Sequence, residues 1–163
     1  MKKMEKLRIM RMLIAFGAMA LALSCSKDGE AVDTEYPVID GDFAGAFPQQ
    51  CDTVARGETF VFKARFSDNV ALGAFSLDVH DNFDHHSHST EVEACDMEQE
   101  NKDPENPFTY IESFDIPGAP KTYEARVEIS VPADVDPGDY HFMIKVTDKE
   151  GWQTLRGLSI KIK

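Results

Sequence analysis

A period of two in hydrophobicity, repeated in five short segments, is the strongest constraint on how this chain can fold. In each segment apolar side chains alternate with polar ones over five to nine residues. Alternation places every second side chain on one face of an extended chain, so each segment is predicted to be a half-buried β-strand. The segments are 58–66, 72–80, 123–131, 140–146 and 158–162.

Turn-forming residues separate these segments, and no segment is predicted to be a helix. Two weaker strands are expected at 36–40 and 108–114, and the acidic stretch 90–106 is expected to be a long connection with room for an extra edge strand. Short strands at this spacing predict an all-β fold, an immunoglobulin-like β-sandwich of about seven strands. The turn signals are Ser67-Asp68-Asn69, Ile116-Pro117-Gly118, Asp136-Pro137-Gly138-Asp139 and Asp148-Lys149-Glu150-Gly151.

The order of strands in such a sandwich makes a further prediction. Lettered as in immunoglobulin domains, the strands are B at 58–66, C at 72–80, E at 122–131, F at 139–147 and G at 152–162. Strands C and F are antiparallel neighbours in one sheet, so the end of C lies beside the start of F. His80 and His141 are therefore expected to face solvent from the same end of the same sheet.

The first 24 residues have the layout of a secretory signal peptide. Basic residues between Lys2 and Arg11 precede an apolar run at 12–23, which at about 12 residues is shorter than the roughly 20 of a membrane-spanning helix. The tetrad Ala22-Leu23-Ser24-Cys25 resembles a bacterial lipoprotein signal, although alanine stands at its first place, and Cys25 is then the lipidated residue. The alternative is a plain signal peptide with an incidental cysteine.

Residues 25–35 are predicted to be a polar, acidic tether that links the lipid anchor to a domain at 36–163. The stretch Ser26–Glu30 resembles the signal that sends lipoproteins of some Gram-negative bacteria to the outer face of the outer membrane. An ordinary linker explains it equally well, and both interpretations stay open. The expected location is the bacterial outer membrane, with the protein lipid-anchored on the cell surface or on the periplasmic face.

Charge restricts the partners that the mature protein can have. The whole chain has 17 basic and 29 acidic residues. The leader holds five of the basic residues and one acidic residue, which leaves 12 and 28 and a formal net charge of −16. Such a domain repels phosphate backbones, so nucleic acid is excluded as a partner.

Two cysteines remain once Cys25 is assigned to the lipid. Thiols in an oxidising envelope compartment usually pair, so a disulfide between Cys51 and Cys95 is predicted. Closing a loop of about 45 residues is expected to stabilise the fold by roughly 4 kcal/mol on the chain-entropy model. The alternatives are free thiols or metal binding.

The segment 80–88 is the one stretch of the sequence in which potential metal-binding side chains are concentrated. Four of the five histidines lie in it, and the expected pairing of strands C and F brings His141 close to them. Imidazole suits zinc, copper and nickel, and carboxylates can complete the ligand shell or fix the ring tautomers. We therefore expect a transition-metal site, with zinc preferred, that uses three or four groups from His80, His85, His86, His88, His141, Asp81 and Asp84.

A polar surface loop is the competing interpretation of the same segment. Histidine, aspartate, asparagine and serine are common in solvated turns, where they bond locally. The histidine spacing also matches no specific zinc motif. If no metal binds, the domain is expected to be an interaction or adhesion module for a protein or glycan partner.

A second cation candidate lies at the opposite end of the predicted sandwich. Asp68 and Asn69 follow strand B and Asp148 ends strand F, so their loops are expected to be neighbours. Oxygen ligands from such loops can hold calcium. Capping of turns is the more common role for these residue types and is the preferred interpretation.

An enzymatic function is not expected. The chain has no recognisable nucleophile–base spacing and no glycine-rich phosphate loop. Ser87 and Ser89 stand among the histidines, but nothing nearby supplies an oxyanion site, so a hydrolase is disfavoured.

Four stretches of the chain resemble a family of short lipoproteins from Gram-negative bacteria that is catalogued only as a domain of unknown function. They are FSDNVAL at 66–72, HDNFDHHSH at 80–88, GDYHF at 138–142 and DKEGWQT at 148–154. The histidine segment is the most specific of them. The resemblance implies an immunoglobulin-like fold and an envelope location, and it implies no activity.

Overall fold

A computed structural model of the chain describes residues 32–86, 95–96 and 101–163. The chain divides into two units, Met1–Val32 and Asp33–Lys163, and of the first unit only Val32 is described. The predicted signal peptide at 1–24, Cys25 and most of the predicted tether lie outside the described residues. Nowhere in the described ranges is there a helix with the length and apolar character needed to cross a bilayer.

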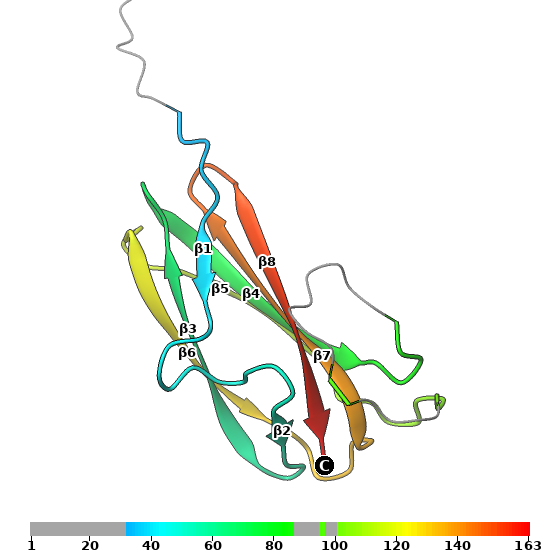
Figure 1. Ribbon diagram of the computed structural model, residues 1–163. Helices are drawn as coiled ribbons and strands as arrows, with labels where there is room; N and C mark the ends of the chain where they lie inside the picture. Colours follow the sequence, from blue (N-terminus) through cyan, green and yellow to red (C-terminus); the bar gives the residue numbers. More distant parts are fainter. Residues whose placement is uncertain (1–31, 87–94, 97–100) are drawn as a thin grey trace, which may run out of the picture. The chain divides into compact units, whose positions relative to one another are not determined.

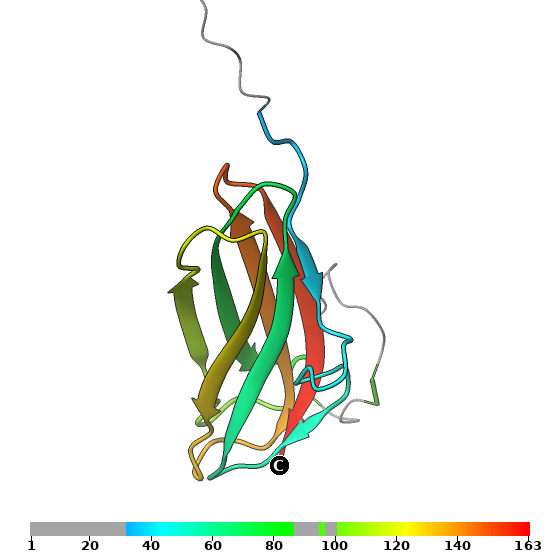
Figure 2. The same cartoon turned by 90° about the vertical axis from the view of Figure 1, so that its left-hand side faces the viewer.

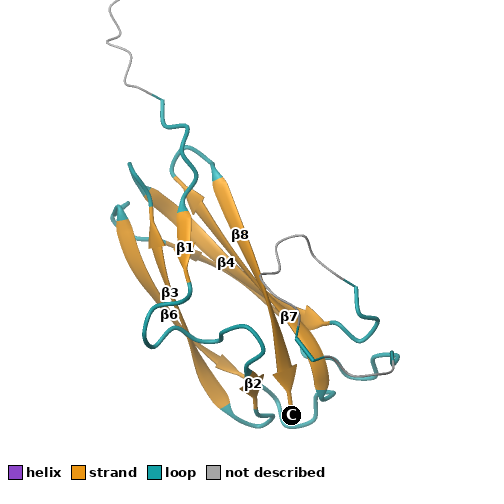
Figure 3. Ribbon diagram, viewed as in Figure 1, coloured by secondary structure: helices purple, strands orange, loops and turns teal. Residues whose placement is uncertain are grey.

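The second unit is built from β-strands that form two sheets (Figures 1 and 3). One sheet has the order β1-β3-β6 and the other the order β2-β8-β7-β4-β5. Figure 2 shows the two sheets facing each other as the layers of a sandwich. The strands are β1 (Val38–Asp40), β2 (Thr53–Val54), β3 (Thr59–Ser67), β4 (Leu72–Asp81), β5 (Tyr110–Asp115), β6 (Thr122–Ser130), β7 (Gly138–Asp148) and β8 (Gln153–Ile162).

The prediction of an all-β, immunoglobulin-like sandwich is confirmed. The pairs β3–β6 and β4–β7 are antiparallel and belong to different sheets, as expected for the B–E and C–F pairs of such a domain. Both weaker strands exist, as β1 and β5. The short β2, which pairs in parallel with β8, was not predicted, because two residues are too few to show a period.

Alternating side chains of the two sheets meet in an aromatic core. Phe62 of β3 packs against Phe142 of β7 with ring centroids 5.6 Å apart, and against Phe75 of β4 at 6.4 Å. All three rings are at most 3% exposed. Burial of these alternating apolar residues gives each strand its orientation and so fixes which residues face outward.

The second compact unit begins at Asp33, within the stretch predicted to be a tether. Asp33 is only 7% exposed. Its carbonyl oxygen accepts a 2.9 Å hydrogen bond from Trp152 Nε1, and the ring of Tyr36 packs edge-on against Trp152 at 5.0 Å. Contacts with an aromatic side chain far along the chain therefore extend the fold in the N-terminal direction.

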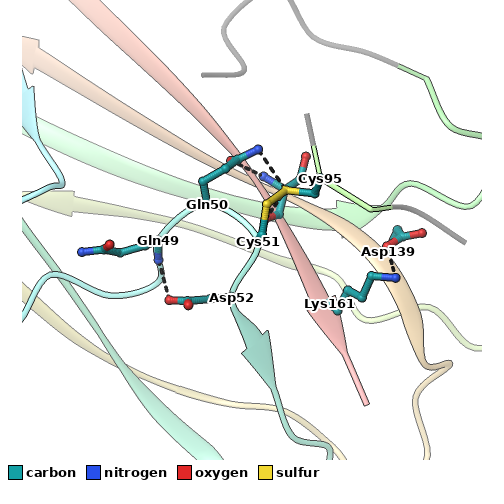
Figure 4. The surroundings of a disulfide bond; sticks show 8 residues. Gln49, Gln50, Cys51, Asp52, Cys95, Asp139 and Lys161 are labelled. Carbon is teal, nitrogen blue, oxygen red and sulfur yellow. Dashed lines mark hydrogen bonds and ion pairs between the residues drawn. A yellow bond between two sulfur atoms is a disulfide. The ribbon is translucent and has the colours of Figure 1, made fainter. Parts of the chain in front are cut away.

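The predicted disulfide between Cys51 and Cys95 is present, with an S–S distance of 2.07 Å (Figure 4). Hydrogen bonds hold this segment against β8, because Cys51 N donates to Ser159 O at 2.8 Å and Ser159 N donates to the side-chain oxygen Oε1 of the neighbouring Gln50 at 3.0 Å. The bridge links the segment before β2 to the long connection between β4 and β5. Of that connection, residues 82–86, 95–96 and 101–109 are described, and they contain no strand.

Candidate functional site

The antiparallel pairing of β4 and β7 places two distant histidines side by side. His80 and His141 are direct partners in the register of these strands. Their ring centroids are 5.4 Å apart. The prediction that strand pairing brings these two residues together is confirmed.

A third histidine joins them from the segment after β4. The ring of His86 lies 4.8 Å from that of His141 and 5.7 Å from that of His80. We call His80, His86 and His141 the histidine cluster. It lies on the outer face of the five-stranded sheet, near the end of β4 and the start of β7.

His141 is buried, and the expectation that it faces solvent is wrong. Its exposed fraction is 0%. The chain after β4 turns back over the outer face of the sheet, and the carbonyl oxygen of His86 lies 3.1 Å from His141 Nε2. An alternating pattern predicts which face a side chain points to, but it does not predict a loop that covers that face.

Hydrogen bonds indicate the tautomer of each ring in the cluster. His80 Nδ1 lies 2.8 Å from Asp78 Oδ1, and His86 Nδ1 lies 2.5 Å from Asp84 Oδ1. Because carboxylates accept hydrogen bonds, the neutral rings carry hydrogen on Nδ1 and the lone pair on Nε2. His141 Nε2 donates to a carbonyl oxygen, so its lone pair lies on Nδ1.

The Asp84 carboxylate is held in its charged form by His86. Hydrogen bonds from the His86 side chain and then from its backbone amide lower the pKa of Asp84, whereas burial opposes them to a smaller extent. A carboxylate behind each of two imidazoles is the arrangement that orients metal-ligating histidines in proteins.

The other predicted metal ligands divide into three groups. His85 lies apart from the cluster, with Nε2 3.9 Å from Asp139 Oδ2. In the part of the chain that the structure describes, Asp81 forms no hydrogen bond or ion pair with a cluster histidine. Asp78, rather than Asp81, is the carboxylate that fixes the tautomer of His80. Asp78 could have been found, because it precedes His80 by two positions and so shares its face. His88 lies outside the described residues, as do Ser87 and Ser89.

A cavity of about 400 Å³, which no sequence pattern predicts, lies beside the disulfide. Its lining includes both cysteines together with Asp139 and Lys161. Lys161 Nζ lies 3.4 Å from Asp139 Oδ1, as Figure 4 shows. The cavity thus has a polar wall with both signs of charge.

At the other end of the sandwich three carboxylates converge. One oxygen from each of Asp33, Asp68 and Asp148 lies within 4.8 Å of the others. Asp68 and Asp148 were expected from the sequence to lie in neighbouring loops, whereas Asp33 lies in the stretch predicted to be the tether. Asn69, the third residue of the predicted set, donates from Nδ2 to Asp33 Oδ1 at 2.9 Å.

Comparison with known proteins gives a family match and a structural likeness. A family model described as "Domain of unknown function (DUF4625)" matches residues 23–163. No curated protein matches the sequence. The structure is similar to that of a mutant of the SrpA adhesin from Streptococcus sanguinis, with 17% sequence identity and a TM-score of 0.46. The match covers 81% of this chain and 57% of the adhesin chain.

Proposed function

The chain belongs to the family described as "Domain of unknown function (DUF4625)", and within that family we propose that it is a binding protein whose histidine cluster holds a transition metal, zinc in preference to copper or nickel. The ion would be sequestered, delivered or sensed, or would have a structural role. We propose no catalytic role for the domain.

The spacing of the three imidazoles is the observation that carries this proposal. Zinc holds imidazole nitrogens at about 2.0–2.1 Å, which puts each ring centroid about 3 Å from the ion and two centroids about 5 Å apart at a tetrahedral angle. The measured centroid distances are 4.8, 5.4 and 5.7 Å. These centroid distances are close to the distance expected for imidazoles that share one ion, and this agreement supports the proposal.

The tautomers assign a ligand atom to each histidine. His80 and His86 would bind through Nε2 and His141 through Nδ1, the atoms that carry the lone pairs. Asp78 and Asp84 would keep the first two rings oriented and make them more basic.

The proposed location is the outer membrane, with the domain anchored by a lipid on Cys25. The support is the three-part layout of the leader, which ends at the small residue Ser24 before that cysteine. An anchored domain with a metal site would act on ions at the membrane surface.

Zinc binding to the purified protein tests the proposal. We expect about one zinc ion per chain by elemental analysis after dialysis, and a rise in melting temperature that a chelator reverses. At 100 times the dissociation constant a ligand stabilises the folded state by about 2.7 kcal/mol. His86→Gln should lose both effects.

His85→Asn is the matched control, because it removes a neighbouring histidine outside the cluster and asparagine tolerates the positive φ of 56° at this position. Wild-type protein that retains no zinc, or equal zinc retention in His86→Gln, would contradict the proposal.

The cavity beside the disulfide favours a second candidate function, a metal-free module for a protein or glycan partner. Its volume of about 400 Å³ lies in the range of about 300–1,000 Å³ typical of small-ligand sites. Binding of the wild-type protein to immobilised glycans or proteins in the presence of a chelator would support this function. Substitution of Lys161, which lines the cavity, should then weaken that binding.

A further inference from the structure

Asp33, Asp68 and Asp148 form an acidic cluster at the end of the sandwich away from the histidine cluster. Asp33 precedes β1, Asp68 lies in the turn between β3 and β4, and Asp148 ends β7. Asp33 is 7% exposed and Asp148 is 4% exposed. Two carboxylates of this cluster are thus more than nine-tenths buried.

Each carboxylate uses one oxygen to hold its own loop. Asp33 Oδ1 accepts from Glu35 N and Asn69 Nδ2, Asp68 Oδ1 accepts from Val70 N and Ala71 N, and Asp148 Oδ1 accepts from Gly151 N and Trp152 N, all at 2.6–3.0 Å. These bonds fix the direction of the carboxyl groups.

The second oxygen of each carboxylate is buried and has no donor. Oδ2 of Asp33, of Asp68 and of Asp148 is inaccessible to solvent and accepts no hydrogen bond from any described residue. Buried polar atoms in native proteins almost always have a partner, so three such oxygens in one cluster indicate a missing common partner.

The charge of the cluster indicates that this partner is a cation. In the described ranges none of the three carboxylates forms an ion pair with a basic side chain. Three neighbouring carboxylates repel one another unless a positive charge lies between them.

We propose that the acidic cluster binds a calcium ion. All three ligands are carboxylate oxygens, which hard cations prefer. Calcium–oxygen distances of about 2.3–2.6 Å put oxygens on opposite sides of the ion roughly 4.6–5.2 Å apart. One oxygen from each of the three carboxylates lies within 4.8 Å of the others, which fits such an ion. Calcium also accepts the irregular geometry of ligands from three separate loops, whereas magnesium demands a near-ideal octahedron.

Such an ion would fasten the start of the folded unit to two turns of the sandwich. Trp152, the single tryptophan of the chain, reports on this junction. Its Nε1 donates to the carbonyl oxygen of Asp33, and its backbone amide donates to Asp148 Oδ1. Calcium binding should therefore change the fluorescence of Trp152.

Titration of the purified protein with calcium chloride tests the proposal. We expect a saturable change in tryptophan emission. When free calcium is about 100 times the dissociation constant, the folding equilibrium constant should rise roughly 100-fold, which corresponds to a melting temperature about 5–10 °C higher than in EGTA.

Two variants distinguish a ligand from a residue that only caps a turn. Asp148→Asn and Asp33→Asn keep an oxygen for the turn hydrogen bonds but remove one charge. Each should lose the calcium response, and in EGTA each should melt at or above the temperature of the wild type, since repulsion is relieved. If the residue only capped its turn, the variant would respond to calcium in the same way as the wild type.

The exposed Asp134, at the opposite end of the sandwich, provides the matched control, and Asp134→Asn should respond to calcium like the wild type. Three results would overturn the proposal. In the first, the wild type shows neither a fluorescence change nor a thermal shift with calcium. In the second, both cluster variants respond to calcium as strongly as the wild type. In the third, the wild type responds to magnesium but not to calcium.

Discussion

The hydroxyl of Tyr140 donates a 2.7 Å hydrogen bond to the carbonyl oxygen of Asp136, four residues earlier in the chain. The same hydroxyl oxygen accepts a 3.1 Å bond from the backbone amide of Phe108. Tyr140 is 0% exposed and stands near the start of β7. This is the tyrosine corner of immunoglobulin-like domains, and here it also joins the β6–β7 corner to the chain that enters β5.

Tyr140→Phe should therefore destabilise the fold without a large change in packing. The substitution leaves the buried amide of Phe108 and the part-buried carbonyl of Asp136 without their partner, at a cost of about 1–3 kcal/mol in the free energy of unfolding. Urea denaturation measures this loss. Tyr36→Phe, at an exposed tyrosine, is the control and should change stability little. Equal stability of Tyr140→Phe and wild type would show that the corner is not needed.

Removal of the disulfide should also destabilise the domain. Cys51 and Cys95 are separated by 44 positions. Cross-links of this kind typically contribute about 2–4 kcal/mol, mainly by restricting the unfolded chain. The double variant Cys51→Ala/Cys95→Ala should lose that amount in guanidinium denaturation. A reducing agent should lower the stability of the wild type and leave the variant unchanged, and an effect on both would be inconsistent with this explanation.

Much of the fold could be predicted because each long strand has one apolar face. In β3, for example, Phe62, Ala64 and Phe66 are all buried, as their spacing of two requires. The meeting of His80 and His141 follows from the same pattern, because faces and antiparallel order together set the register. Strand β2 could not be predicted, since its position depends on pairing with the distant β8.

The details of both sites depend on the path of irregular segments, for which the sequence has no comparable signal. His141 is buried because the chain after β4 folds back over it. The alternation of apolar and polar residues within the strands does not predict the path of that segment. Asp33 belongs to the acidic cluster because the carbonyl oxygen of this residue meets the indole of Trp152. These two residues are 119 positions apart, and no periodic pattern in the sequence predicts a contact between them.

Asp136 makes a pH dependence of stability predictable. Its carboxylate accepts hydrogen bonds from the backbone amides of Asn106 at 2.8 Å and Glu105 at 2.7 Å. The bond from Asn106 is the largest cause that lowers the pKa of Asp136 below its ordinary value of 3.8, and the nearby charges of Lys102 and Arg56 act in the same direction. Burial opposes them.

A carboxyl whose pKa is lower in the folded state stabilises the fold above its unfolded pKa, and this stabilisation is lost as the pH falls through the folded value. The free energy of unfolding of wild type minus that of Asp136→Asn should therefore be constant between about pH 7 and pH 5 and should shrink below about pH 4. Urea denaturation over this pH range measures the difference. A difference independent of pH would be inconsistent with the lowered pKa.

Gly73 occupies a position in β4 where the strand has no room for a side chain. A Cβ atom there would lie 2.7 Å from the carbonyl oxygen of Asp148 and 3.1 Å from that of Thr147, both in the backbone of β7. The register of β4 with β7 shifts between Leu72 and Ala74, so the close approach belongs to an irregularity of the pairing.

Gly73→Ala should consequently push two paired strands apart. A clash with backbone cannot be relieved by a rotamer change, so we expect a loss of about 1–3 kcal/mol, as for an overpacked core. Gly41→Ala is the matched control, because the nearest atoms to its new Cβ belong to the guanidinium group of Arg156, the far end of a flexible side chain. Thermal and urea denaturation should separate the two variants clearly. If the two variants were equally stable, the backbone of β7 at Asp148 would have to move aside at no greater cost than the side chain of Arg156, and the predicted clash would be wrong.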